Sequence, residues 1–113
     1  MISEMDKARH AEERGAILKA LQSDYARKMS SVTMLARVLF MAGQSITPGA
    51  LQFHLSLLAD SGYVRIWRAE EMPIFRPDRG TEARGDLIVF ARLAPRGLQL
   101  IDGQIPSDPG VSF

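Results

Sequence analysis

The sequence predicts a single α/β domain that is mostly helical, with three helices, two strands joined by a long loop, and a short last helix. The clearest evidence is residues 48–61, where proline follows the capping residue Thr47 and leucine recurs at i, i+4 and i+7. Gly62 then suits the left-handed conformation that closes many helices. From Tyr63 onward the composition changes to the aromatic and β-branched residues of a strand. A helix that leads directly into a strand is therefore the central feature of the predicted fold.

Length and composition restrict the class of protein. A chain of 113 residues with 46% hydrophobic and 24% charged residues is typical of one globular domain with its own core. The absence of cysteine excludes disulfides, cysteine-containing zinc sites and thiol nucleophiles. The sequence has no apolar run of roughly 18 residues and no signal-like N-terminus, so we expect a cytoplasmic protein. Because the net charge is only +1, any affinity for nucleic acid must come from local clusters of charge.

Residues 3–24 are predicted to form the first helix because they are rich in Ala, Glu, Lys, Arg and Leu. The second half has the apolar stripe of a core-facing helix, made of Ile17, Leu18, Leu21 and Tyr25. Residues 1–13 have few apolar side chains to bury. They either project into solvent as a charged helix start or form a helical extension that packs against a second subunit.

Residues 32–42 are predicted to form the second helix, after a polar break in which Ser30 or Ser31 can act as the N-cap. Apolar residues occupy nearly its whole circumference, so it either lies at the centre of the domain or covers a partner. Methionines in this region could form an adaptable binding surface, although methionine more often fills irregular gaps in a core. We therefore predict core positions for Met29, Met34 and Met41.

The third predicted helix, Pro48–Ser61, would bury its leucine stripe and leave another face open to a partner. The polar and aromatic positions away from the core are Thr47, Gln52, Phe53 and Ser56. Gln52 is the best candidate among them for reading base edges. Phe53 and Leu57 would form an exposed apolar pair, which suits a protein partner better than a DNA groove.

His54 is predicted to be a partly exposed histidine of the same helix. A metal site would need a second ligand about one helical turn away, and positions 57 and 58 are both leucine. The other histidine, His10, belongs to a different predicted element. We therefore expect neither a metal site nor catalysis at His54.

Two strands follow the third helix. Tyr63–Arg68 and Asp86–Leu93 have the alternating large side chains of strands. Between them, residues 69–86 hold two prolines, two glycines and mixed charge, which predicts a long loop.

The end of the chain contains one more predicted helix, at residues 98–102, after a turn that includes Pro95 and Gly97. The predicted domain covers residues 1–104. Residues 105–113 contain two prolines and little to bury, so we predict a flexible tail that tolerates truncation.

Arginine is concentrated in the strand–loop–strand region. Seven of the 14 basic residues lie there, namely Arg65, Arg68, Arg76, Arg79, Arg84, Arg92 and Arg96. Guanidinium donates bidentately to phosphate, so one interpretation is a loop that grips the DNA backbone. Five acidic residues of the same region leave a surplus of only two positive charges, so the other interpretation is a solvated loop. Between Val38 and Val64 there is no Lys or Arg, so a recognition helix here must take its phosphate contacts from other elements.

Short motifs resemble those of winged helix-turn-helix proteins. The family has an HLxxLxxxGLV passage, which this chain resembles in HLSLLADSGYVRI, and an LTxxG passage, which LAPRG resembles. Over about residues 14–110 the chain is also similar to small winged-helix proteins of Mu-like phages and prophages, and its motifs are shared with arsenic-repressor-like and multiple-antibiotic-resistance-like regulators. The resemblance implies a winged helix-turn-helix fold with a two-stranded wing. It also implies a dimeric, non-enzymatic regulator that binds double-stranded DNA.

We found no P-loop, GxGxxG, HExxH or GxSxG motif, so we expect no enzyme, no cofactor and no metal. The residues expected to contact DNA are Thr47, Gln52, Phe53, Ser56, Arg65, Arg68, Arg76, Arg79 and Arg84. The alternative is a protein-interaction module on the same scaffold that does not itself bind DNA. It would use Phe53, Leu57 and the methionine-rich second helix.

Overall fold

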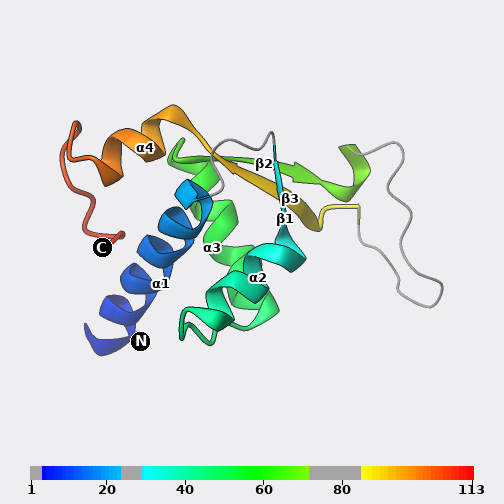
Figure 1. Cartoon of the computed structure of the whole chain (residues 1–113), viewed down its shortest axis with the longest axis horizontal. Coiled ribbons are helices and arrows are strands. Elements are labelled where there is room, and N and C mark those ends of the chain that lie inside the picture. The colour runs from blue at the N-terminus through cyan, green and yellow to red at the C-terminus, as the bar shows by residue number, and fades with distance from the viewer. Residues whose placement is uncertain (1–3, 24–28, 72–84) are drawn as a thin grey trace.

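The computed structural model describes residues 4–23, 29–71 and 85–113 (Figure 1). Its elements are α1 (Glu4–Ser23), β1 (Ser30–Ser31), α2 (Val32–Met41), α3 (Pro48–Asp60), β2 (Val64–Arg68), a turn of 3-10 helix (Ala69–Glu71), β3 (Ile88–Leu93) and α4 (Pro95–Ile101). The described part is mostly helical, with four α-helices and one antiparallel sheet of three strands. The predicted mixed α/β class is confirmed.

Side-chain caps begin α2 and α3, as the sequence indicates. The Ser31 hydroxyl accepts the Met34 N–H at 3.1 Å, and the Thr47 hydroxyl accepts the Ala50 N–H at 3.2 Å. Each pairing satisfies one of the N–H groups that a helix start leaves without a partner. After α3, Gly62 has a φ of +80°, a conformation that glycine adopts at little cost.

The sheet has the order β1-β3-β2, so β3 is its central strand. Between β2 and β3, Arg65 lies opposite Arg92 and Trp67 lies opposite Phe90. The register of this pairing shifts between Trp67 and Arg68. The sequence predicts only two strands, because the two serines of β1 have neither the length nor the composition of a strand. They join the sheet by pairing with Phe90 and Ala91 of β3.

The core lies where α1, α2 and α3 meet one side of the sheet (Figure 1). Its most deeply buried large side chains are Ile17, Leu18, Leu39, Leu51, Leu55, Leu58, Leu93 and His54. The predicted stripes of the first and third helices are therefore confirmed, except for Tyr25, which lies outside the described residues. In residues 4–23, 29–71 and 85–113, none of the helices is both long and apolar enough to cross a membrane.

The prediction that the methionines of the second helix fill the core is wrong for Met34 and Met41. Both are exposed, Met41 to 81%, and Met29 is half-buried. α2 is ten residues long and buries only Leu35 and Leu39. The remaining apolar side chains of α2 consequently form a surface and not a second core face.

The C-terminal segment, residues 105–113, lies against α1 in the structure. The Ser112 N–H donates to the Ala11 carbonyl at 2.9 Å, and Val111 is buried. A Cβ atom on Gly15 would lie 1.9 Å from the Ser112 carbonyl oxygen, so glycine allows the two backbones to approach each other. The first half of α1 is therefore covered on one side by the end of its own chain, an arrangement that neither sequence alternative included.

Candidate functional site

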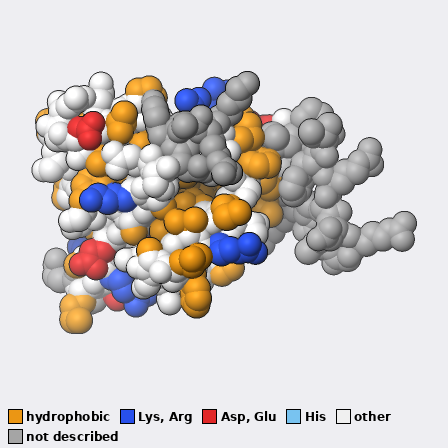
Figure 2. Space-filling view, viewed as in Figure 1, with side chains coloured by type: hydrophobic (Ala, Val, Ile, Leu, Met, Phe, Trp, Pro, Cys, Tyr) orange, Lys and Arg blue, Asp and Glu red, His pale blue; other side chains and the backbone are white. Residues whose placement is uncertain are grey.

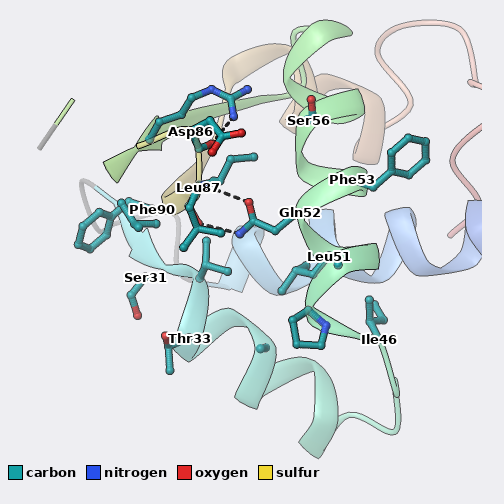
Figure 3. Close-up of a pocket in the computed structure, with 17 residues that line it drawn as sticks. Ser31, Thr33, Ile46, Leu51, Gln52, Phe53, Ser56, Asp86, Leu87 and Phe90 are labelled. Carbon is teal, nitrogen blue, oxygen red and sulfur yellow. Dashed lines mark hydrogen bonds between the residues drawn. The ribbon is translucent and has the colours of Figure 1, made fainter. Parts of the chain in front are cut away.

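A groove of about 900 Å³ runs beside the N-terminal half of α3 (Figure 3). It is bounded by the start of α2, the segment that leads into α3, and residues 86–90 of β3 and its approach. Four of the predicted contact residues line it: Gln52, Phe53, Ser56 and Arg68. The fold thus places Arg68 at the same groove as the three predicted residues of α3, although it is distant from them in the sequence.

Gln52 has a different role in the structure from the base reading that the sequence suggests. Its side-chain amide donates to the Ile88 carbonyl at 2.8 Å, and its Oε1 accepts the Ile88 N–H at 2.9 Å (Figure 3). β1 pairs with β3 only at Phe90 and Ala91, so Gln52 continues the pairing of that edge at Ile88. If Gln52 turned toward a base, both Ile88 groups would lose this partner. Gln52 therefore links α3 to β3 by two hydrogen bonds.

Phe53 and Thr47 are the exposed members of the predicted set on α3. The Phe53 side chain is 55% exposed, and its ring lies on the other side of α3 from the Gln52 amide (Figure 3). Thr47 is exposed and caps the helix. Ser56 and Leu57 are both half-buried, so the predicted apolar pair of Phe53 and Leu57 is only partly available to a partner.

Arg65 and Arg68 both belong to β2, and of these two only Arg68 lines the groove. The Arg68 guanidinium donates to the Asp86 carbonyl at 2.7 Å. Arg65 is exposed on the outer face of the sheet, with its guanidinium carbon 4.9 Å from the centre of the Trp67 ring. Arg76, Arg79 and Arg84 lie outside the described residues.

The prediction that His54 is partly exposed is wrong, because its side chain is 1% exposed. Leu51 lies three residues before it and Leu58 four residues after it, so His54 falls inside the leucine stripe. This spacing is visible in the sequence and indicates a buried position. The prediction of an exposed side chain followed instead from the polarity of histidine. Figure 1 shows α1 beside α3, and residues of α1 contact the His54 ring.

Charged and polar groups of α1 surround the His54 ring. Arg14 Nε donates to His54 Nδ1 at 3.2 Å, and the carboxylate of Glu13 lies 3.7 Å from Nε2. Among the described residues, Nε2 has no hydrogen-bond partner. The ring of His10 meets that of His54 edge to face, with 5.5 Å between centroids. The two histidines are therefore in contact, although they are remote in the sequence.

Burial is the main reason why the pKa of His54 is lowered from its ordinary value of 6.5, because a buried ring loses the hydration of its charged form. The positive charge of Arg14 lowers this pKa further, whereas Glu13 opposes the shift. Within the part of the chain that the structure describes, no group of three or more His, Cys, Asp or Glu side chains is arranged to hold a metal ion.

Exposed apolar side chains lie on α2 and on the first half of α3. They are Met34, Val38, Phe40, Met41 and Phe53. Figure 2 shows hydrophobic side chains over the region of this face where α2 lies in Figure 1. Residues 39–63 contain neither Lys nor Arg, although α2 also holds the exposed Arg37, and the described arginines of the predicted site are on β2.

A scan of protein-family models and searches of curated proteins and of solved structures gave no match to this chain.

Proposed function

We propose that the chain is a winged helix-turn-helix protein that binds double-stranded DNA as a non-enzymatic transcriptional regulator. The observation that carries the proposal is the element order α1-β1-α2-α3-β2-β3 with the sheet order β1-β3-β2. In this order α3 would be the recognition helix and the connection from β2 to β3 the wing. The resemblance of residues 54–66 to winged-helix proteins of phages and prophages supports the same interpretation.

The contacts in this proposal differ from those expected from the sequence in one respect. Thr47 and Phe53 at the exposed start of α3 would lie closest to the DNA, with Arg68 of the groove on the phosphate backbone. Gln52 is left out, because its amide is engaged with Ile88. Arg76, Arg79 and Arg84 of the connecting loop would supply further phosphate contacts.

A salt series tests the proposal. Affinity for a mixed-sequence duplex is measured at several salt concentrations, and log affinity should fall linearly with log salt, with a slope of about −0.9 for each phosphate contact. Arg79→Ala and Arg84→Ala should each reduce the slope by about one contact. Lys19→Ala, an exposed cation of α1, is the matched control and should leave the slope unchanged. Absence of binding even at low salt would overturn the proposal.

A second candidate is a protein-interaction module on the same scaffold. The observation in its favour is the exposed apolar surface of α2, where Phe40 is 71% and Met41 81% exposed. Large apolar side chains left exposed on one element are typical of contact sites between proteins. We propose a second copy of this chain as the partner, which is also compatible with a dimeric DNA-binding protein.

A further inference from the structure

A continuous chain of hydrogen bonds fastens the C-terminal segment to the domain. The Tyr63 hydroxyl donates to Asp108 Oδ2 at 2.8 Å, and Asp108 Oδ1 accepts the Gly110 N–H at 2.8 Å. The Gly110 carbonyl accepts from Arg14 Nη1 at 3.1 Å, and Nε of the same guanidinium donates to His54. One arginine therefore connects the end of the chain to a buried histidine.

The protonation state of His54 decides whether Arg14 can keep this position. A neutral imidazole has one donor and one acceptor nitrogen, and Nδ1 is the acceptor here, so the proton is on Nε2. A second proton would have to bind to Nδ1. Two N–H donors and two positive charges would then face each other over 3.2 Å, and the hydrogen bond from Arg14 would be lost.

We propose that residues 108–113 form a pH-sensitive latch, in which protonation of His54 displaces Arg14 and releases the segment from α1. The inference is separate from the proposed DNA binding. Release would expose Ala11 and Gly15, where the two backbones are in closest contact. It would also expose the buried side chain of Val111.

The other charged groups around His54 do not replace the contact that is lost. Glu13 lies on the Nε2 side, so it stabilises a charged ring without accepting the new Nδ1 proton, and Arg9 is 3.8 Å from the same carboxylate. His10 touches the ring from α1, and the backbone of Gly110 connects Asp108 to Arg14. α3 contributes no other titratable side chain from Pro48 to Ala59.

The direction of the effect follows from the lowered pKa of His54, which burial and then Arg14 produce. The latched state binds the proton less readily than a released state in which Arg14 has left Nδ1, because Arg14 is one cause of the lowered pKa. The released state therefore gains population as the pH falls through the pKa of His54 in that state. The gain ends once the pH is below the lower pKa of the latched state.

Hydrogen exchange of the Ser112 amide measures the latch directly, because this amide donates to the Ala11 carbonyl. Its protection factor is followed by NMR from about pH 7.5 to about pH 5, together with the ring resonances of His54. We expect protection to fall by up to about tenfold per pH unit, the limit for one proton, with its midpoint at the titration of His54. Amides of β3 should keep their protection. Constant protection of Ser112, or a midpoint unrelated to His54, would overturn the proposal.

Three variants separate His54 from its neighbours. His54→Asn places an amide oxygen near the position of Nδ1 without a titrating group, so Ser112 should stay protected at both ends of the pH range. Arg14→Gln should leave Ser112 unprotected throughout. His10→Asn removes the other histidine, whose ring meets that of His54, and should keep the transition. If His54→Asn does not fold, the agreement of the two midpoints in the unmodified chain still decides the result.

Discussion

At the scale of single residues, two polar side chains of α3 that the sequence pattern places at the surface both serve the fold. Gln52 completes the edge of β3, and His54 lies inside the core beside Arg14. Periodicity places a residue on a face of a helix, but it does not show which neighbouring element covers that face. The partners of Gln52 and His54 are at positions 88 and 14, and neither separation is visible as a pattern.

Because Gln52 links α3 to β3, we predict that removing its side-chain amide lowers the stability of the fold. Gln52→Ala leaves the Ile88 N–H and carbonyl without this partner, so the free energy of unfolding should fall by about 1–3 kcal/mol. Urea denaturation measures the change. Gln99→Ala, at an exposed position on α4, is the matched control and should change the free energy by less than about 0.5 kcal/mol. Unchanged stability with weakened DNA binding would instead support base reading by Gln52.

At the scale of elements, the absence of a side chain at Gly15 of α1 allows the C-terminal segment to pack against this helix. Alanine normally stabilises the interior of a helix by up to about 1 kcal/mol relative to glycine. In Gly15→Ala, however, the new Cβ would overlap the Ser112 carbonyl, so the segment must leave α1 and Val111 becomes exposed. We expect the free energy of unfolding to fall by about 1–3 kcal/mol.

Gly49→Ala provides the control for this prediction, because Gly49 is also helical and a Cβ there meets nothing within 4 Å. Its stability should be unchanged or higher by up to about 1 kcal/mol. Thermal or urea unfolding of the two variants in parallel gives the comparison. An increase in stability for Gly15→Ala would show that the C-terminal segment is not docked on α1.

The element order and most boundaries are predictable from the sequence, because caps, glycines and leucine spacing are local signals. α3 shows this best, since Thr47, Pro48 and Gly62 mark both of its ends. β1 and the docking of the C-terminal segment are not predictable in this way. β1 depends on pairing with β3, and the C-terminal segment depends on its contact with α1, both across long separations in the sequence. Their own residues, among them serines, prolines and a glycine, have no strand or helix pattern.

At the scale of the whole molecule, the exposed apolar side chains and the described arginines of the predicted DNA contact lie on different elements, although α2 also has the exposed Arg37. The exposed apolar side chains lie on α2 and the start of α3, and Arg65 and Arg68 lie on β2. Self-association and attraction to phosphate would therefore depend on different residues, and each can be removed while the other is kept.

The double variant Phe40→Ser, Met41→Ser tests the apolar surface. Both side chains are more than two-thirds exposed, so the stability of the folded chain should change by less than about 1 kcal/mol. If a second copy covers α2, the wild-type chain should dimerise with concentration in sedimentation equilibrium, and the double variant should dissociate at least about tenfold more readily, because burying two such side chains contributes more than about 1.4 kcal/mol. Met5→Ser, an equally exposed methionine on α1, is the matched control. A wild-type chain that stays monomeric at all concentrations would show that α2 has no partner in a second copy.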